Sequence, residues 1–303
     1  MVSVIMITYN HEQYIQQAIE GVLMQQCDFT YELVIGEDCS TDSTRVICEK
    51  FTKQYPGIIR LLPSTRNYGM MSNFIRTLNA CSGKYIALCE GDDYWTDPHK
   101  LQKQVDLLEM DDTLSGTFHD VYILRSNRLQ INKSYLQKYK HHNGIFTAEE
   151  VLINWMGHTC SFVFKRSAID QYDLDQIGIM DFSLAFLVAL SGNLKYIPQI
   201  MGVYRDHPGG ITKIRPNYQF KLDNRQKMYY QLNIASNYRY TDTINYHLLK
   251  LEYMYELACM NNLRCLPLIF RYYKLFTRYK FKGERVKNLR KYLAALMCRY
   301  YFG

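Results

Sequence analysis

The chain has 303 residues, of which 48% are hydrophobic and 21% charged, so it can bury a sizeable core and is not an intrinsically disordered protein. Its nine cysteines form no C-x-x-C pair, which argues against a zinc framework and a secreted disulfide scaffold and favours a reducing compartment. The net charge of +7 is unevenly placed: residues 215–303 hold 17 Lys and Arg against 5 Asp and Glu, so residues 1–214 have a net charge of −5.

Neither export nor membrane insertion is expected from the sequence. The first ten residues lack the charged start and long apolar stretch of a signal peptide. Nowhere do about 18 uncharged apolar residues follow one another, which is the length that a bilayer span needs. We therefore expect a cytoplasmic protein.

Apolar runs typical of buried strands alternate with segments of helical periodicity over the first 90 residues. Strands are predicted at residues 2–7, 31–36, 58–63 and 84–89, and helices at residues 11–26, 41–55 and 73–81. This alternation is typical of an α/β fold in which parallel strands have helices packed on both faces of the sheet.

A polar loop follows each predicted strand. The loops read T-Y-N-H-E at 8–12, G-E-D-C-S-T-D-S at 36–43, S-T-R-N-Y-G at 64–69 and E-G-D-D-Y-W at 90–95. Because the carboxyl ends of parallel strands meet at one edge of a sheet, we expect the four loops to share one ligand-binding rim. None contains G-x-G-x-x-G or G-x-x-x-x-G-K-[ST], so the usual fingerprints of a dinucleotide fold or a P-loop are missing.

The loop at 90–95 crowds three carboxylates, Glu90, Asp92 and Asp93, into four positions. Carboxylates held side by side raise one another's pKa unless a cation neutralises them. Mg²⁺ and Mn²⁺ take oxygen ligands from one or two carboxylates and fill their remaining positions with phosphate oxygens and water. The loop therefore predicts one half of a metal–diphosphate site.

The motifs T-Y-N at 8–10, E-D-C-S-T-D-S at 37–43 and E-G-D-D-Y-W at 90–95 resemble those of the family 2 glycosyltransferases, which are nucleotide-sugar enzymes of the GT-A fold. The resemblance continues in Met180-Asp181-Phe182, in G-N-L-K-Y-I-P at 192–198 and in G-V-Y-R-D-H-P-G-G at 202–210, and it covers residues 1–212. It implies a Rossmann-like, mostly parallel central sheet with helices on both faces.

The resemblance also implies roles for individual residues. The nucleotide would contact Thr8, Tyr9, Asn10, Glu12, Asp38, Arg66, Glu90 and Asp92. Within this set, Asp38 would accept a hydrogen bond from the base, and Glu90 would stand where the family's D-x-D motif has its first, ribose-contacting carboxylate. Asp92 would bind Mn²⁺ or Mg²⁺, with Asp93 beside it and His207 completing the coordination.

Glycosyl transfer makes two demands on such a site. Negative charge develops on the leaving phosphate, and a divalent cation stabilises it. The acceptor hydroxyl needs a carboxylate that takes its proton as it attacks. Asp181 is predicted as this base, because it lies between apolar residues that could raise its pKa and because it matches the family's catalytic acidic residue. The resemblance further implies inversion at the anomeric carbon.

Each of these residues also has a purely structural interpretation. T-Y-N could end a strand and cap a helix, and Glu90 to Asp93 could form a solvated turn before a helix that opens at Asp97-Pro98. Asp181 could cap the apolar helix that follows it, and His207 could be an ordinary loop histidine. The order of the loops and their placement at strand ends favour the functional interpretation.

Residues 215–303 are predicted to form a basic, aromatic-rich helical extension. From residue 262 onward the chain has 11 Lys and Arg and one acidic residue, interleaved with apolar residues at spacings that suit helices. Such helices could hold the protein at the anionic inner face of a membrane, or pack on the catalytic domain with a solvated basic face. Nucleic acid is not expected as a partner, because the acidic body would repel phosphates.

The sequence thus predicts a catalytic domain at residues 1–214, with a nucleotide-binding half at 1–110 and an acceptor-side half at 111–214. The predicted reaction is inverting transfer of a sugar from a nucleoside-diphosphate sugar, UDP-linked by default. The acceptor would be a hydroxyl of a saccharide or lipid-linked molecule in cell-surface polysaccharide or glycolipid assembly. Two alternatives stay open: a metal-dependent sugar nucleotidyltransferase, and a catalytically silent nucleotide- or sugar-binding module.

Overall fold

A computed structural model describes residues 1–131, 144–154, 157–178, 181–210 and 218–248. The chain divides into two compact units, residues 1–215 and 216–303. The division falls one residue after the end of the predicted catalytic domain, while the functions predicted for its two halves stay predictions.

The first four strands are parallel and confirm the predicted alternation with helices. They are β1 (Val2–Thr8), β2 (Tyr31–Glu37), β3 (Ile59–Leu61) and β4 (Tyr85–Leu88), and they lie side by side in the order β3-β2-β1-β4. In this register Thr8 lies opposite Glu37, and Ile5 lies opposite Leu88. The loops that leave β1, β2 and β4 therefore start at the same edge of the sheet.

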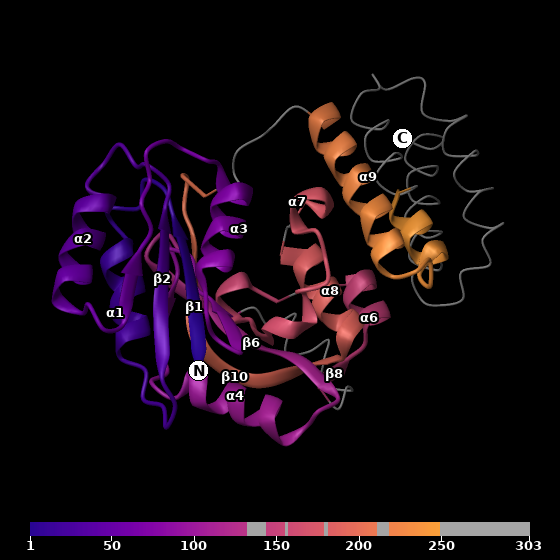
Figure 1. The fold of residues 1–303 in the computed structure, drawn as a ribbon, viewed down its shortest axis with the longest axis horizontal. Helices are drawn as coiled ribbons and strands as arrows, with labels where there is room; N and C mark the ends of the chain where they lie inside the picture. The colour runs from indigo at the N-terminus through magenta and orange to yellow at the C-terminus, as the bar shows by residue number, and fades with distance from the viewer. Residues whose placement is uncertain (132–143, 155–156, 179–180, 211–217, 249–303) are drawn as a thin grey trace, which may run out of the picture. The chain divides into compact units, whose positions relative to one another are not determined.

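Three helices cover this parallel part of the sheet. Helices α1 (Ile15–Leu23) and α2 (Thr44–Gln54) lie on one face, and α3 (Met70–Ala80) lies on the other (Figure 1). Helix α1 begins later than predicted, because a turn at residues 11–14 precedes it, in which the Tyr14 N–H donates to the carbonyl of His11. The apolar stripe of α1 is buried against the sheet as its periodicity predicts.

The second half of unit 1 adds antiparallel pairs. After β5 (Tyr94–Trp95) and α4 (Lys100–Met110) come β6 (Leu114–Arg125), β7 (Arg128–Ile131), β8 (Ile145–Phe146), α6 (Ala148–Asn154), η1 (Thr159–Ser161), β9 (Val163–Lys165), η2 (Arg166–Ala168), α7 (Leu174–Ile177), α8 (Asp181–Ser191) and β10 (Asn193–Asp206). Strand β9 runs antiparallel between β4 and β6, whereas the longest pairing of this half, β6 with β10, is parallel. The predicted mostly parallel sheet with helices around it is thereby confirmed.

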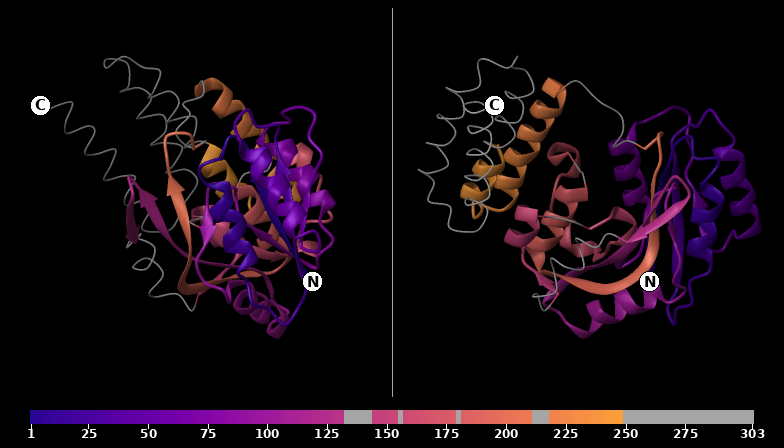
Figure 2. Two further views of the ribbon diagram at one scale, coloured as in Figure 1. Left: turned by 90° about the vertical axis from the view of Figure 1, so that its left-hand side faces the viewer. Right: turned by 180° about the vertical axis from the view of Figure 1, so that it is seen from behind.

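Strand β10 pairs with both β6 and β5. It is bent (Figure 2), and its register against β6 shifts twice between Ile197 and Gly202, as β-bulges produce. Beyond the bend it pairs antiparallel with β5, so that Val203 lies opposite Tyr94. Continuing this register brings the residues after Val203 alongside the E-G-D-D segment.

Unit 2 is described over residues 218–248. It contains α9 (Tyr218–Ala235) and a further helical segment at 241–248. None of the helices in the described part of the chain has the length and hydrophobicity that a membrane span requires. The basic stretch at 262–303, on which the membrane prediction depends, lies outside the described residues.

Candidate active site

A cavity of about 400 Å³ opens at the carboxyl ends of the parallel strands. This volume lies within the range of small-molecule sites. Its walls come from the end of β1, the loops after β2 and β4, the segment before α3, η1, the start of α8 and the end of β10. The predicted site residues that line it are Thr8, Tyr9, Asp38, Glu90, Asp92, Asp93, Asp181 and His207.

Three predicted nucleotide contacts lie outside this lining. The Asn10 side-chain oxygen accepts the Thr41 N–H at 2.8 Å, and a Glu12 carboxylate oxygen accepts the Ser43 N–H at 2.9 Å. Both therefore fasten the T-Y-N-H-E loop to the loop after β2. Arg66 is exposed, with its guanidinium 5.0 Å from the centre of the Tyr68 ring. The nucleotide-binding roles of these three residues stay predictions.

Asp38 shapes one wall of the cavity. It is 3% exposed, and its two carboxylate oxygens accept the backbone N–H groups of Tyr68, at 2.7 Å, and Gly69, at 2.9 Å. The carboxylate therefore fixes the segment that enters α3, where Gly69 has a φ of 82°. Its predicted contact with the base stays a prediction, since each carboxylate oxygen has a second lone pair.

Asp93 and Arg205 join the acidic loop to β10. An oxygen of Asp93, which is 2% exposed, accepts the backbone N–H of Arg205 at 2.8 Å. The Arg205 guanidinium donates to the backbone carbonyl of Asp92 and lies 4.4 Å from the centre of the Tyr94 ring. These contacts hold the backbone of Asp92 in place and orient the Asp93 carboxylate toward β10.

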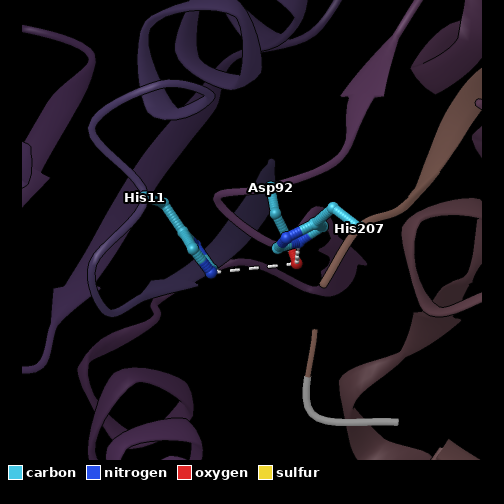
Figure 3. Close-up of side chains that lie close together, drawn as sticks. All are labelled: His11, Asp92 and His207. Atoms are coloured by element: carbon cyan, nitrogen blue, oxygen red, sulfur yellow. Dashed lines mark hydrogen bonds and ion pairs between the residues drawn. The ribbon is translucent and has the colours of Figure 1, made fainter. Parts of the chain in front are cut away.

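Three possible metal ligands converge beside this junction (Figure 3). They are His11, Asp92 and His207, and their ligand atoms all lie within 4.8 Å of one another. The Oδ2 atom of Asp92 lies 3.1 Å from Nε2 of His207 and 3.8 Å from Nε2 of His11. The structure thus brings together two of the three predicted metal ligands, whereas the third, Asp93, lies outside this trio.

Burial and crowding decide the protonation of the acidic residues. Burial and the neighbouring carboxylates Asp93, Asp181 and Asp92 raise the pKa of Glu90 well above its usual value. Burial, followed by the charge of Asp92, does the same for the pKa of Asp93. Burial also opposes ionisation of Asp92, but its hydrogen bond with His207 and the charge of His11 bring its pKa below the usual value. Asp92 is accordingly the carboxylate that stays ionised.

The Glu90 carboxyl group interacts electrostatically with Asp93, Asp181 and Asp92. Its Oε2 atom is buried and has no hydrogen-bond partner among the described residues. A buried acceptor without a donor is destabilising. A buried oxygen of this kind, on a residue that lines the cavity, suits a site that a polar or cationic ligand completes.

Asp181 is the first residue of α8, next to residues 179–180, which lie outside the described part of the chain. Its side chain is exposed to the cavity but lies deep within the protein, and this burial raises its pKa, while hydrogen bonding with Thr159 opposes the rise. The direction agrees with the sequence prediction. A carboxylate with a raised pKa at the wall of a cavity is suited to accept a proton.

Among the residues that contact Asp92, His11 and Arg205 were not predicted as site residues. His11 belongs to T-Y-N-H-E, one of the four loops expected at the rim, and Arg205 belongs to Y-R-D-H. The loops themselves were therefore found, but the pairing of His11 with Asp92 depends on strand order. If β1 had been known to lie next to β4, the proximity of His11 and Asp92 could have been predicted.

Comparison with protein families identifies one match. The model of the family described as glycosyl transferase family 2 matches residues 3–173, which is more than half of the chain. An uncharacterized protein of Mycobacterium tuberculosis is 34% identical over 211 residues. The match covers 69% of this chain and 60% of that relative, so the chain spans less than two thirds of the relative's length.

Solved structures share the fold, and two of them illustrate the likeness. The crystal structure of S. aureus TarS 1–349 in complex with UDP-GlcNAc has a TM-score of 0.66 and 16% identity, and the match covers 95% of this chain and 83% of that one. The mannosyltransferase PcManGT from Pyrobaculum calidifontis, in complex with GDP-Man and Mn²⁺, has a TM-score of 0.55 and 17% identity, with 99% and 87% covered. At these identities the likeness shows the GT-A fold alone.

Proposed function

Since this chain belongs to glycosyl transferase family 2, we propose that it is a metal-assisted, inverting enzyme that moves a sugar from a nucleoside-diphosphate sugar to an acceptor hydroxyl. One observation carries the proposal: an ionised Asp92 with two histidines and a carboxyl group suited to be a base, Asp181, line the same cavity at the carboxyl ends of the strands. A donor's diphosphate and an acceptor's hydroxyl need these two kinds of group within one site.

The residues present fit a divalent cation. Asp92, His207 and His11 offer one oxygen and two nitrogen ligand atoms that lie within 4.8 Å of one another. A cation held by the trio would supply positive charge next to the leaving diphosphate. Thr8, Tyr9 and Asp38, which line the same cavity, would bind the nucleoside part of the donor.

A residue of the chain, Asp181, would then accept one proton from the acceptor hydroxyl. The acceptor oxygen attacks the anomeric carbon from the face opposite the leaving group, its proton passes to a carboxylate oxygen of Asp181, and the bond from the anomeric carbon to the diphosphate oxygen breaks. Burial in the cavity wall makes Asp181 a stronger base than a solvated aspartate, since its pKa is raised. Attack on one face and departure from the other inverts the configuration.

The donor and the acceptor are further parts of the proposal. UDP is the default nucleotide of the family, and TarS and PcManGT bind UDP-GlcNAc and GDP-Man, respectively. We take the acceptor to be a saccharide or a lipid-linked molecule in cell-surface polysaccharide or glycolipid assembly. A cytoplasmic enzyme held peripherally at the inner face of the membrane by its basic C-terminal residues would suit such an acceptor.

A panel of UDP-, GDP- and dTDP-sugars, incubated with the protein and Mn²⁺, tests the proposal through release of nucleoside diphosphate. We expect release from one donor class, and a decrease of about 100-fold or more for Asp181→Asn with nucleotide affinity unchanged. Asp175→Asn is the matched control, because Asp175 is an exposed residue of α7 that does not line the cavity. Binding of nucleoside triphosphates in preference to every diphosphate would instead indicate a nucleotidyltransferase, and wild-type turnover of Asp181→Asn would remove the base.

A further inference from the structure

The metal-ligand trio comes from three separate strand ends. His11 follows β1, Asp92 follows β4 and His207 follows β10. Two ligands at about 2.1 Å from one ion can be at most about 4.2 Å apart. The largest separation in the trio is below 4.8 Å, so small side-chain rotations are enough to close the trio around one ion.

His11 is oriented for this role by its neighbours. Its Nδ1 atom lies 3.1 Å from the hydroxyl of Thr8, which is 3% exposed, and its backbone N–H donates to the Thr44 hydroxyl at 2.8 Å. The contact at Nδ1 directs the other ring nitrogen, Nε2, toward Asp92. A metal-binding histidine typically has its second nitrogen fixed in this way.

His207 is held in a similar manner, whereas Asp93 is not available. The His207 ring packs against the Tyr14 ring, with centroids 4.7 Å apart, and is nearly perpendicular to the His11 ring. Asp93 accepts the Arg205 N–H and is 2% exposed, so its carboxylate is already paired within the protein. Of the adjacent carboxylates, only Asp92 therefore faces the two imidazoles.

We propose that His11 is the third protein ligand of the metal site, and that its two-imidazole, one-carboxylate set makes the site bind transition metals more tightly than Mg²⁺. This inference rests on the proposed function, since it specifies the cation which that function requires. Imidazole suits transition metals, whereas Mg²⁺ prefers oxygen ligands. Affinity for such a site increases from Mn²⁺ to Co²⁺ to Ni²⁺.

Metal binding to the full chain, after chelator treatment and without any sugar donor, tests the inference. Free Mn²⁺ is measured by electron paramagnetic resonance during titration, and Co²⁺ and Mg²⁺ are measured by competition. For the wild type we expect Co²⁺ to bind more tightly than Mn²⁺ and Mn²⁺ more tightly than Mg²⁺. His11→Gln should weaken Mn²⁺ binding by about tenfold or more, with a larger loss for Co²⁺ and a smaller one for Mg²⁺.

Two further variants separate ligation from a loss of folding. His99→Gln makes the same substitution at an exposed residue before α4 and should leave all three affinities unchanged. His11→Asp replaces the imidazole by a carboxylate and should shift the preference toward Mg²⁺. In addition, the Co²⁺ protein should show paramagnetically shifted proton resonances from two imidazoles, and His11→Gln from one.

The outcomes separate this inference from the proposed function. If His11→Gln binds Mn²⁺ and Co²⁺ as tightly as the wild type does, or if both proteins show one shifted imidazole, His11 is not a ligand and the inference is wrong. The predicted affinities in a protein that transfers no sugar from any donor would support the inference and reject the proposed function.

Discussion

Lys100 is a buried lysine that packs against Trp95, and its replacement by methionine should stabilise the protein. Its side chain is 0% exposed, and its Nζ atom has no hydrogen-bond partner among the described residues. The atom lies 3.9 Å from the centre of the Trp95 ring. Burial lowers the pKa of Lys100 from 10.5 to about 7. Methionine has a similar length and carries no charge.

The expected gain follows from this pKa. One pKa unit corresponds to about 1.4 kcal/mol, so the fall from 10.5 to about 7 corresponds to a cost of about 5 kcal/mol for folding with a charged Lys100. Lys100→Met should therefore raise the free energy of unfolding by up to about 5 kcal/mol under conditions in which the lysine is charged.

The gain should depend on pH in a defined direction. Below pH 7 the lysine is charged in both the folded and the unfolded chain, so the whole cost is present. Between pH 7 and about 10.5 the unfolded chain holds a proton that the folded chain lacks, so the wild type becomes more stable as pH rises. Urea unfolding of both proteins at pH 6, 8 and 10 should show an advantage of the variant that shrinks at each step.

A second lysine on the same helix provides the control. The side chain of Lys103 is 40% exposed and forms an ion pair with Asp97 at 2.6 Å. Lys103→Met should therefore lower the free energy of unfolding by up to about 1 kcal/mol and should not raise it. The reasoning fails if Lys100→Met is no more stable than the wild type at pH 6, or if its advantage is the same at pH 6 and pH 10.

Three further outcomes are expected. Glu90→Gln should raise the melting temperature at pH 7 but not at pH 4. The reason is that the raised pKa of Glu90 disfavours the folded state only at a pH where the carboxyl group of the unfolded chain is ionised. The same substitution should weaken donor binding in isothermal titration calorimetry. Gly91→Ala should destabilise the fold by about 1–3 kcal/mol in urea unfolding, because a Cβ there would lie 2.6 Å from Cβ of Thr8. Gly57→Ala is the control, since a Cβ at residue 57 meets nothing within 4 Å and the substitution should be nearly neutral. Equal effects of the two substitutions would contradict this explanation. The 303-residue chain should sediment with anionic but not with neutral vesicles, and added salt should reduce the fraction that sediments. Equal sedimentation with both kinds of vesicle would reject the membrane proposal.

The parallel strands and their rim of loops could be predicted because the signals are local. Each apolar run and each helical stripe lies within one segment, and right-handed crossovers then fix which loops meet. Helix ends were less accurate, as in α1, where the turn at residues 11–14 has apolar and polar residues that also fit a helix. The antiparallel insertion of β9 was not predicted, because pairing between β4 and β9 joins residues about 80 positions apart.

The choice of Asp92 over Asp93 as the main metal ligand came from the family resemblance, because no local pattern in the sequence separates the two carboxylates. Asp92 and Asp93 are adjacent, chemically identical and part of one motif. Their surroundings differ because β10 pairs with β5, which brings the Arg205 N–H to Asp93 and the imidazole of His207 to Asp92. That pairing joins segments more than 100 residues apart, and no local pattern specifies it.

The same pairing makes assembly of the site depend on the whole of unit 1. Asp92 is positioned through its backbone by Arg205, while its side chain faces His11 from the first loop and His207 from the last. Neither the parallel half nor the β6–β10 half contains the complete trio. A cation bound to all three would therefore link the two halves and stabilise the native state by an amount that grows with the logarithm of its concentration. Mutations that loosen the β5–β10 pairing should accordingly weaken metal binding before they unfold the sheet, because the trio tolerates less displacement than the hydrophobic core does.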